Sequence, residues 1–237
     1  LFFFLNILEV DISKLDTSQI ENMSSMFKGC SQLTSLNFGN INTATLTSMA
    51  EMFYGCSKLT SLDLNVFDTS NVNNMMNMFY QCTKLEELHI ESFDTSNVVD
   101  MTSMFYECKS LTTLDLSNFR TSSVTSMGNM FQNCQSLISL NVENFDTSNV
   151  VSMNRIFYNC YSLISLNINS FDTSKVVEPQ FCFDGIGNEL IFCADPSKSA
   201  NISKLITSFN NNCEDPCFSG NNVKLIKDNK ECTNDSC

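Results

Sequence analysis

The chain has 237 residues, with 26 acidic against 13 basic side chains and a formal net charge of −13. Lys and Arg form no cluster, so we expect neither nucleic acid nor an anionic membrane surface as a partner. No stretch reaches the roughly 18 apolar residues of a membrane span, and 7 Gly with 3 Pro argue against a disordered linker.

Residues 1–6 are interpreted as the tail of a preceding helix. Ile7, Val10, Ile12 and Leu15 stand where later units place their strand residues, so we expect the sequence to start inside a repeat. A signal-peptide remnant is the alternative, although LFFFL is too short for a complete apolar signal core.

A 26-residue repeat dominates the chain. Thr recurs at one position from Thr17 to Thr173, and Phe at another from Phe27 to Phe183. Such a period indicates a tandem array whose units bury their apolar sides only against their neighbours, so a lone unit should not fold. The cysteines that mark the step are Cys30, Cys56, Cys82, Cys108, Cys134 and Cys160.

The second half of each unit predicts a short strand. It reads L-x-x-L-x-L, as in Leu59, Leu62 and Leu64, and the final alternation is the period of a half-buried strand. Recurring every 26 residues, these strands are expected to stack in parallel, about 4.8 Å apart.

The first half predicts a short helix. Its apolar residues are spaced three, three, one and three, which places them on one helical stripe, and the preceding Asp94, Thr95 and Ser96 are of types that cap helix starts. The stripe consists of Val98, Met101, Met104, Phe105 and Cys108.

The FDTSNV, MFxxC and LTxLDL pieces resemble the BspA-like leucine-rich-repeat surface proteins of bacteria and some protists, over about residues 7–192. The resemblance implies adhesion to host or matrix proteins. One departure is that Phe stands where the general pattern has Asn or Cys, so the neighbouring Asp and Thr are expected to bond the corner backbone instead. The positions are Phe67, Phe93, Phe119, Phe145 and Phe171.

The expected fold is therefore an α/β repeat solenoid of the leucine-rich type. It is right-handed, has one short strand and one short helix in each of about seven units, and carries a parallel sheet on one face. Residues 1–178 form the array, and residues 179–237 form a degenerate last repeat and a cysteine-rich C-terminal cap, because regularity fails after Val177.

The six repeat cysteines are interpreted as buried free thiols that act as small apolar fillers, because Ile186 takes the same place in the last unit. The regularly spaced methionines are likewise interpreted as core residues.

The tail cysteines follow at uneven spacings among polar residues, which indicates disulfides whose pairing the sequence leaves open. A four-thiolate zinc site on Cys213, Cys217, Cys232 and Cys237 is the alternative. Glycosylation sequons at Asn22, Asn201 and Asn234 suit an exported protein. The disulfide set is Cys182, Cys193, Cys213, Cys217, Cys232 and Cys237.

The outward strand positions are the candidate binding surface, the concave face of a leucine-rich repeat. Its middle is acidic around the only histidine, for which a surface ion pair is the expected role. A calcium ion on Asp63, Glu87 and Asp115 is an alternative to solvated charges. The predicted partner-binding residues are Asp63, Glu86, Glu87, His89, Glu91, Thr113, Asp115, Asn141 and Glu143.

No motif predicts a catalytic site, a metal or a cofactor. A Ser-His-Asp arrangement could be built only around His89, and no GxSxG accompanies it. We expect a cell-surface or secreted recognition module that binds an extracellular protein or glycan. A structural spacer that projects other domains is the alternative, and a hydrolase using His89 is a third possibility.

Overall fold

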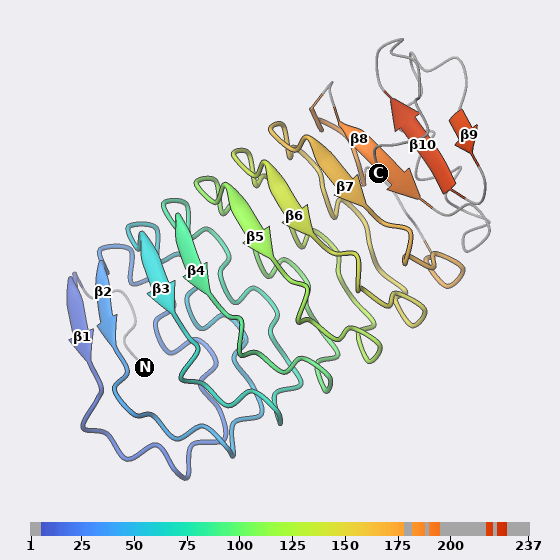
Figure 1. The fold of residues 1–237 in the computed structure, drawn as a ribbon. Helices are drawn as coiled ribbons and strands as arrows, with labels where there is room; N and C mark the ends of the chain where they lie inside the picture. The colour runs from blue at the N-terminus through green and yellow to red at the C-terminus, as the bar shows by residue number, and fades with distance from the viewer. Residues whose placement is uncertain (1–5, 178–181, 188–189, 195–216, 220–221, 227–237) are drawn as a thin grey trace.

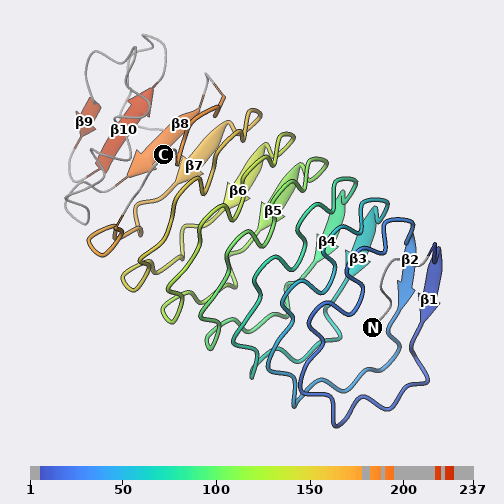
Figure 2. The same cartoon turned by 180° about the vertical axis from the view of Figure 1, so that it is seen from behind.

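The computed structural model describes residues 6–177, 182–187, 190–194, 217–219 and 222–226. Coils of 26 residues lie side by side along one axis, and each contributes one strand to the same side of the stack (Figure 1). The opposite view shows the strands behind and the connecting turns in front (Figure 2). The repeat solenoid expected from the sequence is confirmed in this coarse form.

Each strand from β1 to β7 spans three residues whose central side chain points inward, because alternate residues of a strand face opposite sides, and β8 spans four residues. The eight coil strands are β1 (Glu9–Asp11), β2 (Ser35–Asn37), β3 (Ser61–Asp63), β4 (Glu87–His89), β5 (Thr113–Asp115), β6 (Ser139–Asn141), β7 (Ser165–Asn167) and β8 (Ile191–Ala194), and β9 (Cys217–Ser219) and β10 (Asn222–Ile226) follow them.

The row of strands is interrupted. In the described residues β1 pairs with β2 and β3 with β4, and a third sheet has the order β5-β6-β7-β8-β10-β9. The pairs among β1 to β8 are parallel, whereas β10 is antiparallel to both β8 and β9. No strand ladder joins β2 to β3 or β4 to β5, so the strand side is not one continuous sheet.

The prediction of a short helix in each unit is wrong. The described residues contain no helix, and residues 94–108 form a series of turns instead. Met104 N–H donates to Met101 O and Cys108 N–H to Phe105 O, each across three residues. The apolar residues are thus the first and fourth members of successive β-turns, and this step of three imitates a helical stripe.

The turn segments cannot be helical because every other N–H is used by the next coil. Ser103 N–H donates to Gly128 O and Phe105 N–H to Met130 O, both at 2.9 Å. Ser103 and Glu107 have positive φ values of 53° and 57°, as the third residue of a type II turn requires. Inter-coil hydrogen bonds compensate the cost of this left-handed backbone in non-glycine residues.

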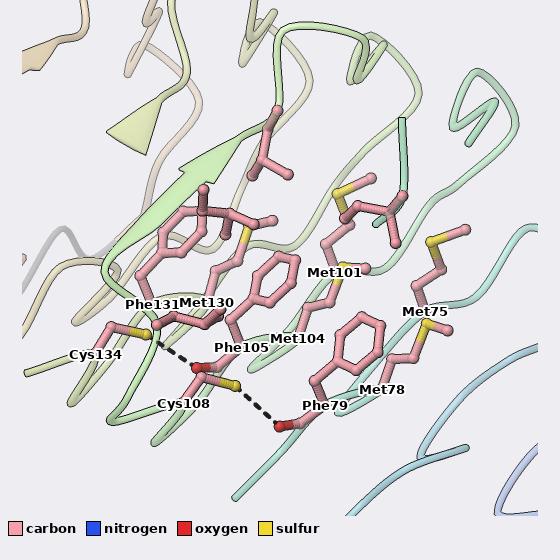
Figure 3. Packing of buried hydrophobic residues seen from close by; sticks show 14 of the residues in the cluster. Met75, Met78, Phe79, Met101, Met104, Phe105, Cys108, Met130, Phe131 and Cys134 are labelled. Carbon is pink, nitrogen blue, oxygen red and sulfur yellow. Dashed lines mark hydrogen bonds between the residues drawn. The ribbon is translucent and has the colours of Figure 1, made fainter. Parts of the chain in front are cut away.

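A single core runs the length of the array. Figure 3 shows part of it, built from columns of equivalent residues. Phe105 stacks between Phe79 and Phe131 with ring centroids 5.5 and 5.6 Å away. Met101 and Met104 are fully buried beside them, so the interpretation of the methionines as core residues is confirmed. Stacked or offset aromatic pairs add to the free energy gained by burial.

The repeat cysteines occupy another buried column. Cys108 Sγ donates to Phe79 O at 3.2 Å and Cys134 Sγ to Phe105 O at 3.1 Å, as the dashed lines in Figure 3 mark. All six are free and buried, which confirms the prediction of buried free thiols. Burial raises the pKa of Cys82 and of Cys160 to about 12, so these thiols stay protonated.

A buried threonine stands at the corner that follows each strand from β1 to β7. Thr95 Oγ1 donates to Arg120 O at 3.0 Å and accepts the Arg120 N–H at 2.8 Å, which ties one coil to the next through both backbone groups. Thr17, Thr43, Thr69 and Thr147 make the same double contact one coil further on. The expectation that Thr bonds the corner backbone is confirmed.

The last coil departs from the repeat sequence while keeping its packing. Phe183 stacks on Phe157 at 5.5 Å, Ile186 and Leu190 are buried, and β8 extends the parallel row beside β7. The antiparallel β10 then covers the edge of β8 and ends the parallel row.

Candidate recognition surface

The strand face comprises the exposed outward side chains of the coil strands and of the residues beside them. On β3 and β4, Ser61 lies next to Glu87, and Asp63 next to His89, in the parallel register. On β5 and β6, Asp115 pairs with Asn141 in the same way. The predicted outward positions are therefore outward, and all nine predicted partner-binding residues lie on this side with exposed or half-exposed side chains.

An acidic cluster on the fourth coil surrounds His89. His89 Nδ1 lies 3.3 Å from Glu91 Oε1, and their side chains are 51% and 64% exposed. Asn65 Nδ2, one coil earlier, donates to Glu91 Oε2 at 2.7 Å. These contacts lower the pKa of Glu91, chiefly through the Asn65 hydrogen bond, so its carboxylate is charged. Glu86 and Glu87 are exposed beside it.

Several acidic or amide residues of the strand face also hold their own backbone. Asp63 Oδ1 accepts the Asn65 N–H at 2.9 Å, and Asp115 Oδ1 accepts the Ser117 N–H at 3.0 Å. Asn141 Oδ1 accepts the Glu143 N–H at 3.3 Å. One oxygen of each side chain is thus committed to a local turn, which leaves the second carboxylate oxygen of the two Asp residues and the amide nitrogen of Asn141 for a partner.

The calcium alternative finds no support in this geometry. No group of three or more His, Cys, Asp or Glu side chains among the described residues is placed to hold a metal ion. Asp63 and Glu87 lie on paired strands, but Asp115 lies across the break between β4 and β5. The three carboxylates are therefore not brought together.

A row of tyrosines on the turn segments escaped the sequence analysis. The rings of Tyr54, Tyr80 and Tyr106 stack with centroids 4.4 and 4.3 Å apart, and Lys28 Nζ lies 4.8 Å from the Tyr54 centroid. Burial of the half-exposed rings raises the pKa of Tyr80 above its usual value. The recurrence of Tyr at the 26-residue step is the signal that would find this row. Because the rings cover one another's faces, it mainly ties coils together.

The repeated part of the chain matches a known protein family. A family described as "Mycoplasma protein of unknown function, DUF285" matches at residues 1–89 and 83–189. The chain belongs to the DUF285 family. This match to the repeats confirms the prediction of a BspA-like leucine-rich-repeat protein for the DUF285 array.

No curated protein matches this DUF285 chain. Solved structures that match include a leucine-rich repeat protein from Bacteroides ovatus ATCC 8483, with 16% sequence identity and a TM-score of 0.36. The match covers 85% of this chain and 65% of that protein, so the DUF285 chain spans less than two thirds of its length.

The predicted disulfide set is wrong at Cys182. This residue is a buried free thiol in the methionine column of the DUF285 array, and its Sγ donates to Met153 O at 3.1 Å. Like the repeat cysteines, Cys182 fills space in the core and donates its S–H to a backbone carbonyl of the preceding coil. The side chains of Cys193 and Cys217 and the whole of Cys213, Cys232 and Cys237 lie outside the described residues, so those disulfides and the zinc alternative stay predictions.

Of the predicted glycosylation sites, Asn22 alone is described. Its side chain is exposed, and Oδ1 accepts the Ser24 N–H at 2.7 Å. Asn201 and Asn234 lie outside the described residues, and glycosylation stays a prediction at all three. Nowhere in the described part of the chain does a helix reach the length and apolar character needed to cross a bilayer.

Proposed function

We propose that this chain is a recognition module, at the cell surface or secreted, that binds an extracellular protein or glycan through the strand face. The observation that carries the proposal is a contrast between columns. Buried positions repeat the same residue from coil to coil, whereas the strand face changes from Ser61 and Asp63 to Glu87 and His89 on the next coil. A surface that only filled space between other domains needs no such local change.

The acidic cluster supports a basic partner. Glu86, Glu87 and Glu91 are exposed beside His89, and no Lys or Arg of the described residues forms an ion pair with them. Together with the net charge of −13, this favours a protein surface that carries Lys or Arg. Binding should then weaken as salt rises, because exposed charges are screened.

The test is a triple variant, Glu87→Ala, His89→Ala and Glu91→Ala, in a binding screen against extracellular proteins and glycans at two salt concentrations. Partner capture should be lost, because His89 and two of the three carboxylates of the cluster are removed while the buried columns stay intact. Capture at full strength by the triple variant would refute the strand face as the binding surface.

The control variant is Val99→Thr with Val151→Thr. Both residues are exposed, lie on another side of the coil, and share their column with Thr47 and Thr125, so threonine fits there. Capture should be unchanged. A chain that captures no partner under any of these conditions would favour the spacer alternative.

A further inference from the structure

One corner of the array departs from all the others in how its backbone is held. At six of the seven equivalent corner positions stands an Asp or Asn whose Oδ1 accepts the N–H of the residue two positions on, at 2.8–3.2 Å. These pairs are Asp16 with Ser18, Asn42 with Ala44, Asp68 with Ser70, Asp94 with Ser96, Asp146 with Ser148 and Asp172 with Ser174.

In the fifth coil the capping residue is replaced by Arg120. Arginine has no side-chain acceptor, and no described residue accepts the Ser122 N–H. The guanidinium is exposed and joins no ion pair within the described part of the chain. Its charge helps to lower the pKa of Asp94, after the two hydrogen bonds from Ser96. This corner thus combines an exposed cation with an unused N–H donor.

The same residues line a surface depression of about 550 Å³. Its wall includes Asn118 and Asn144, whose amide nitrogens are already engaged. Asn118 Nδ2 donates to Ile90 O at 3.2 Å, and Asn144 Nδ2 donates to Ser117 O at 3.0 Å. Their side-chain oxygens accept no hydrogen bond from the described residues, so they can accept hydroxyl groups.

We infer that this depression binds a sugar carboxylate, a hexuronate unit of a glycan, whose carboxylate takes the place of the missing capping side chain. It accepts the Ser122 N–H and pairs with Arg120, while ring hydroxyls donate to Asn118 and Asn144. Charge-assisted hydrogen bonds from Arg to a carboxylate are among the strongest available. The site lies at the corner, so the inference does not depend on the strand face.

Neighbouring carboxylates do not exclude an anion there. Asp146 itself lines the depression, and its Oδ1 accepts the Ser148 N–H at 3.0 Å. Asp68 and Asp94 occupy the same column in successive coils, and each accepts its own corner N–H in the same way, so the column already holds carboxylates one coil apart. A bound carboxylate between Asp94 and Asp146 therefore gives this coil the acceptor that the equivalent corners have. The positive charge of Arg120 stabilises it there. The depression is also large enough for one sugar ring, and an arginine on a flat surface would offer no such concave space.

The experiment titrates the chain with D-glucuronate, with D-glucose and with acetate while following the backbone amide signals by NMR. We expect a saturable shift of the Ser122 amide with glucuronate and none with glucose. Acetate should bind at least about tenfold more weakly, because it lacks the hydroxyls. Equal affinity for acetate would overturn the assignment to a sugar, and an unmoved Ser122 amide would overturn the site.

The variant Arg120→Asp restores the residue that the other corners carry and should fold like them. It should lose at least about tenfold in glucuronate affinity, because the cation is gone and its own carboxylate caps Ser122. The control Lys84→Asp changes the net charge equally at an exposed position outside the depression, and its affinity should be unchanged. An equal loss in both variants would show bulk charge as the cause and refute the site.

Discussion

The two sides of each coil differ in how they join neighbouring coils. On the turn and corner side, isolated parallel bridges run without a break from Asn22 to Ser152, and threonine, cysteine and aromatic columns accompany them. On the strand side, ladders are missing between β2 and β3 and between β4 and β5. The turn side is continuous where the strand side is divided.

The comparison teaches that the array is held together away from its candidate binding surface. Stability that depends on the buried columns leaves the exposed strand residues free to differ from coil to coil, as Asp63 and His89 do. In a repeat protein each interface between neighbours contributes its own free energy, so substitutions on the two sides should have unequal costs.

The largest expected effect is that of Phe105→Ala. The ring is fully buried between Phe79 and Phe131, and removing such a side chain leaves a cavity that costs about 3–5 kcal/mol. The matched strand variant, Leu88→Ala in β4, removes a partly buried side chain and should cost about 1–2 kcal/mol. Urea denaturation of both variants measures the difference, and equal losses would contradict the comparison.

The next effect is a loss of unfolding free energy at alkaline pH, which arises from the buried thiols of the turn side. Burial raises the pKa of Cys82 and Cys160 from 9.0 to about 12, so their contribution is full below pH 9 and falls as pH rises from there toward 12. At pH 10 each of the two thiols should lower the free energy of unfolding by about 1 kcal/mol, because the thiol loses its proton in the unfolded chain and keeps it in the folded chain.

Urea unfolding at pH 8 and pH 10 measures this loss, with Cys82→Ala/Cys160→Ala as the comparison. The double variant should depend less on pH than the parent chain, although it starts from a lower stability. A parent chain whose unfolding free energy is the same at both values would show that the thiols ionise in the folded state.

An effect of similar size is expected from Thr95→Val, which keeps the side-chain shape and removes the hydroxyl. The N–H and C=O of Arg120 then lose their partner, at a cost of about 1–3 kcal/mol. The same change at the exposed Thr113 on β5 should alter stability by less than about 0.5 kcal/mol. Thermal unfolding of the two variants tests the pair, and a loss at Thr113 as large as at Thr95 would count against it.

Much of the architecture follows from the sequence, because a fixed 26-residue step requires that equivalent residues meet. It correctly predicts that Phe105, Met104 and Cys108 are buried, that Thr95 bonds a corner and that Asp63 faces outward. The helix was wrong for a physical reason. Apolar residues recur at steps of three both in a helical stripe and in successive β-turns. The spacing of apolar residues therefore cannot reveal that the Ser103 N–H donates to the next coil.

The candidate sites were harder to predict because they depend on departures from the repeat. His89 and Arg120 each replace an Asp or Asn that caps a local turn in neighbouring coils. The sequence singles out His89 as the only histidine, but the significance of Arg120 needs the empty capping position and the depression around it. The breaks in the strand row depend on hydrogen-bond distances between coils, which no residue type specifies.

The hydrogen bonds between side chains or backbone of neighbouring coils join residues 23 to 29 apart in sequence. Deleting or duplicating any block of 26 residues within the array would therefore rejoin partners of the same kind on both sides of the junction. The chain can change its length in steps of about 4.8 Å by copying errors in its gene, and each surviving coil would keep its own surface chemistry.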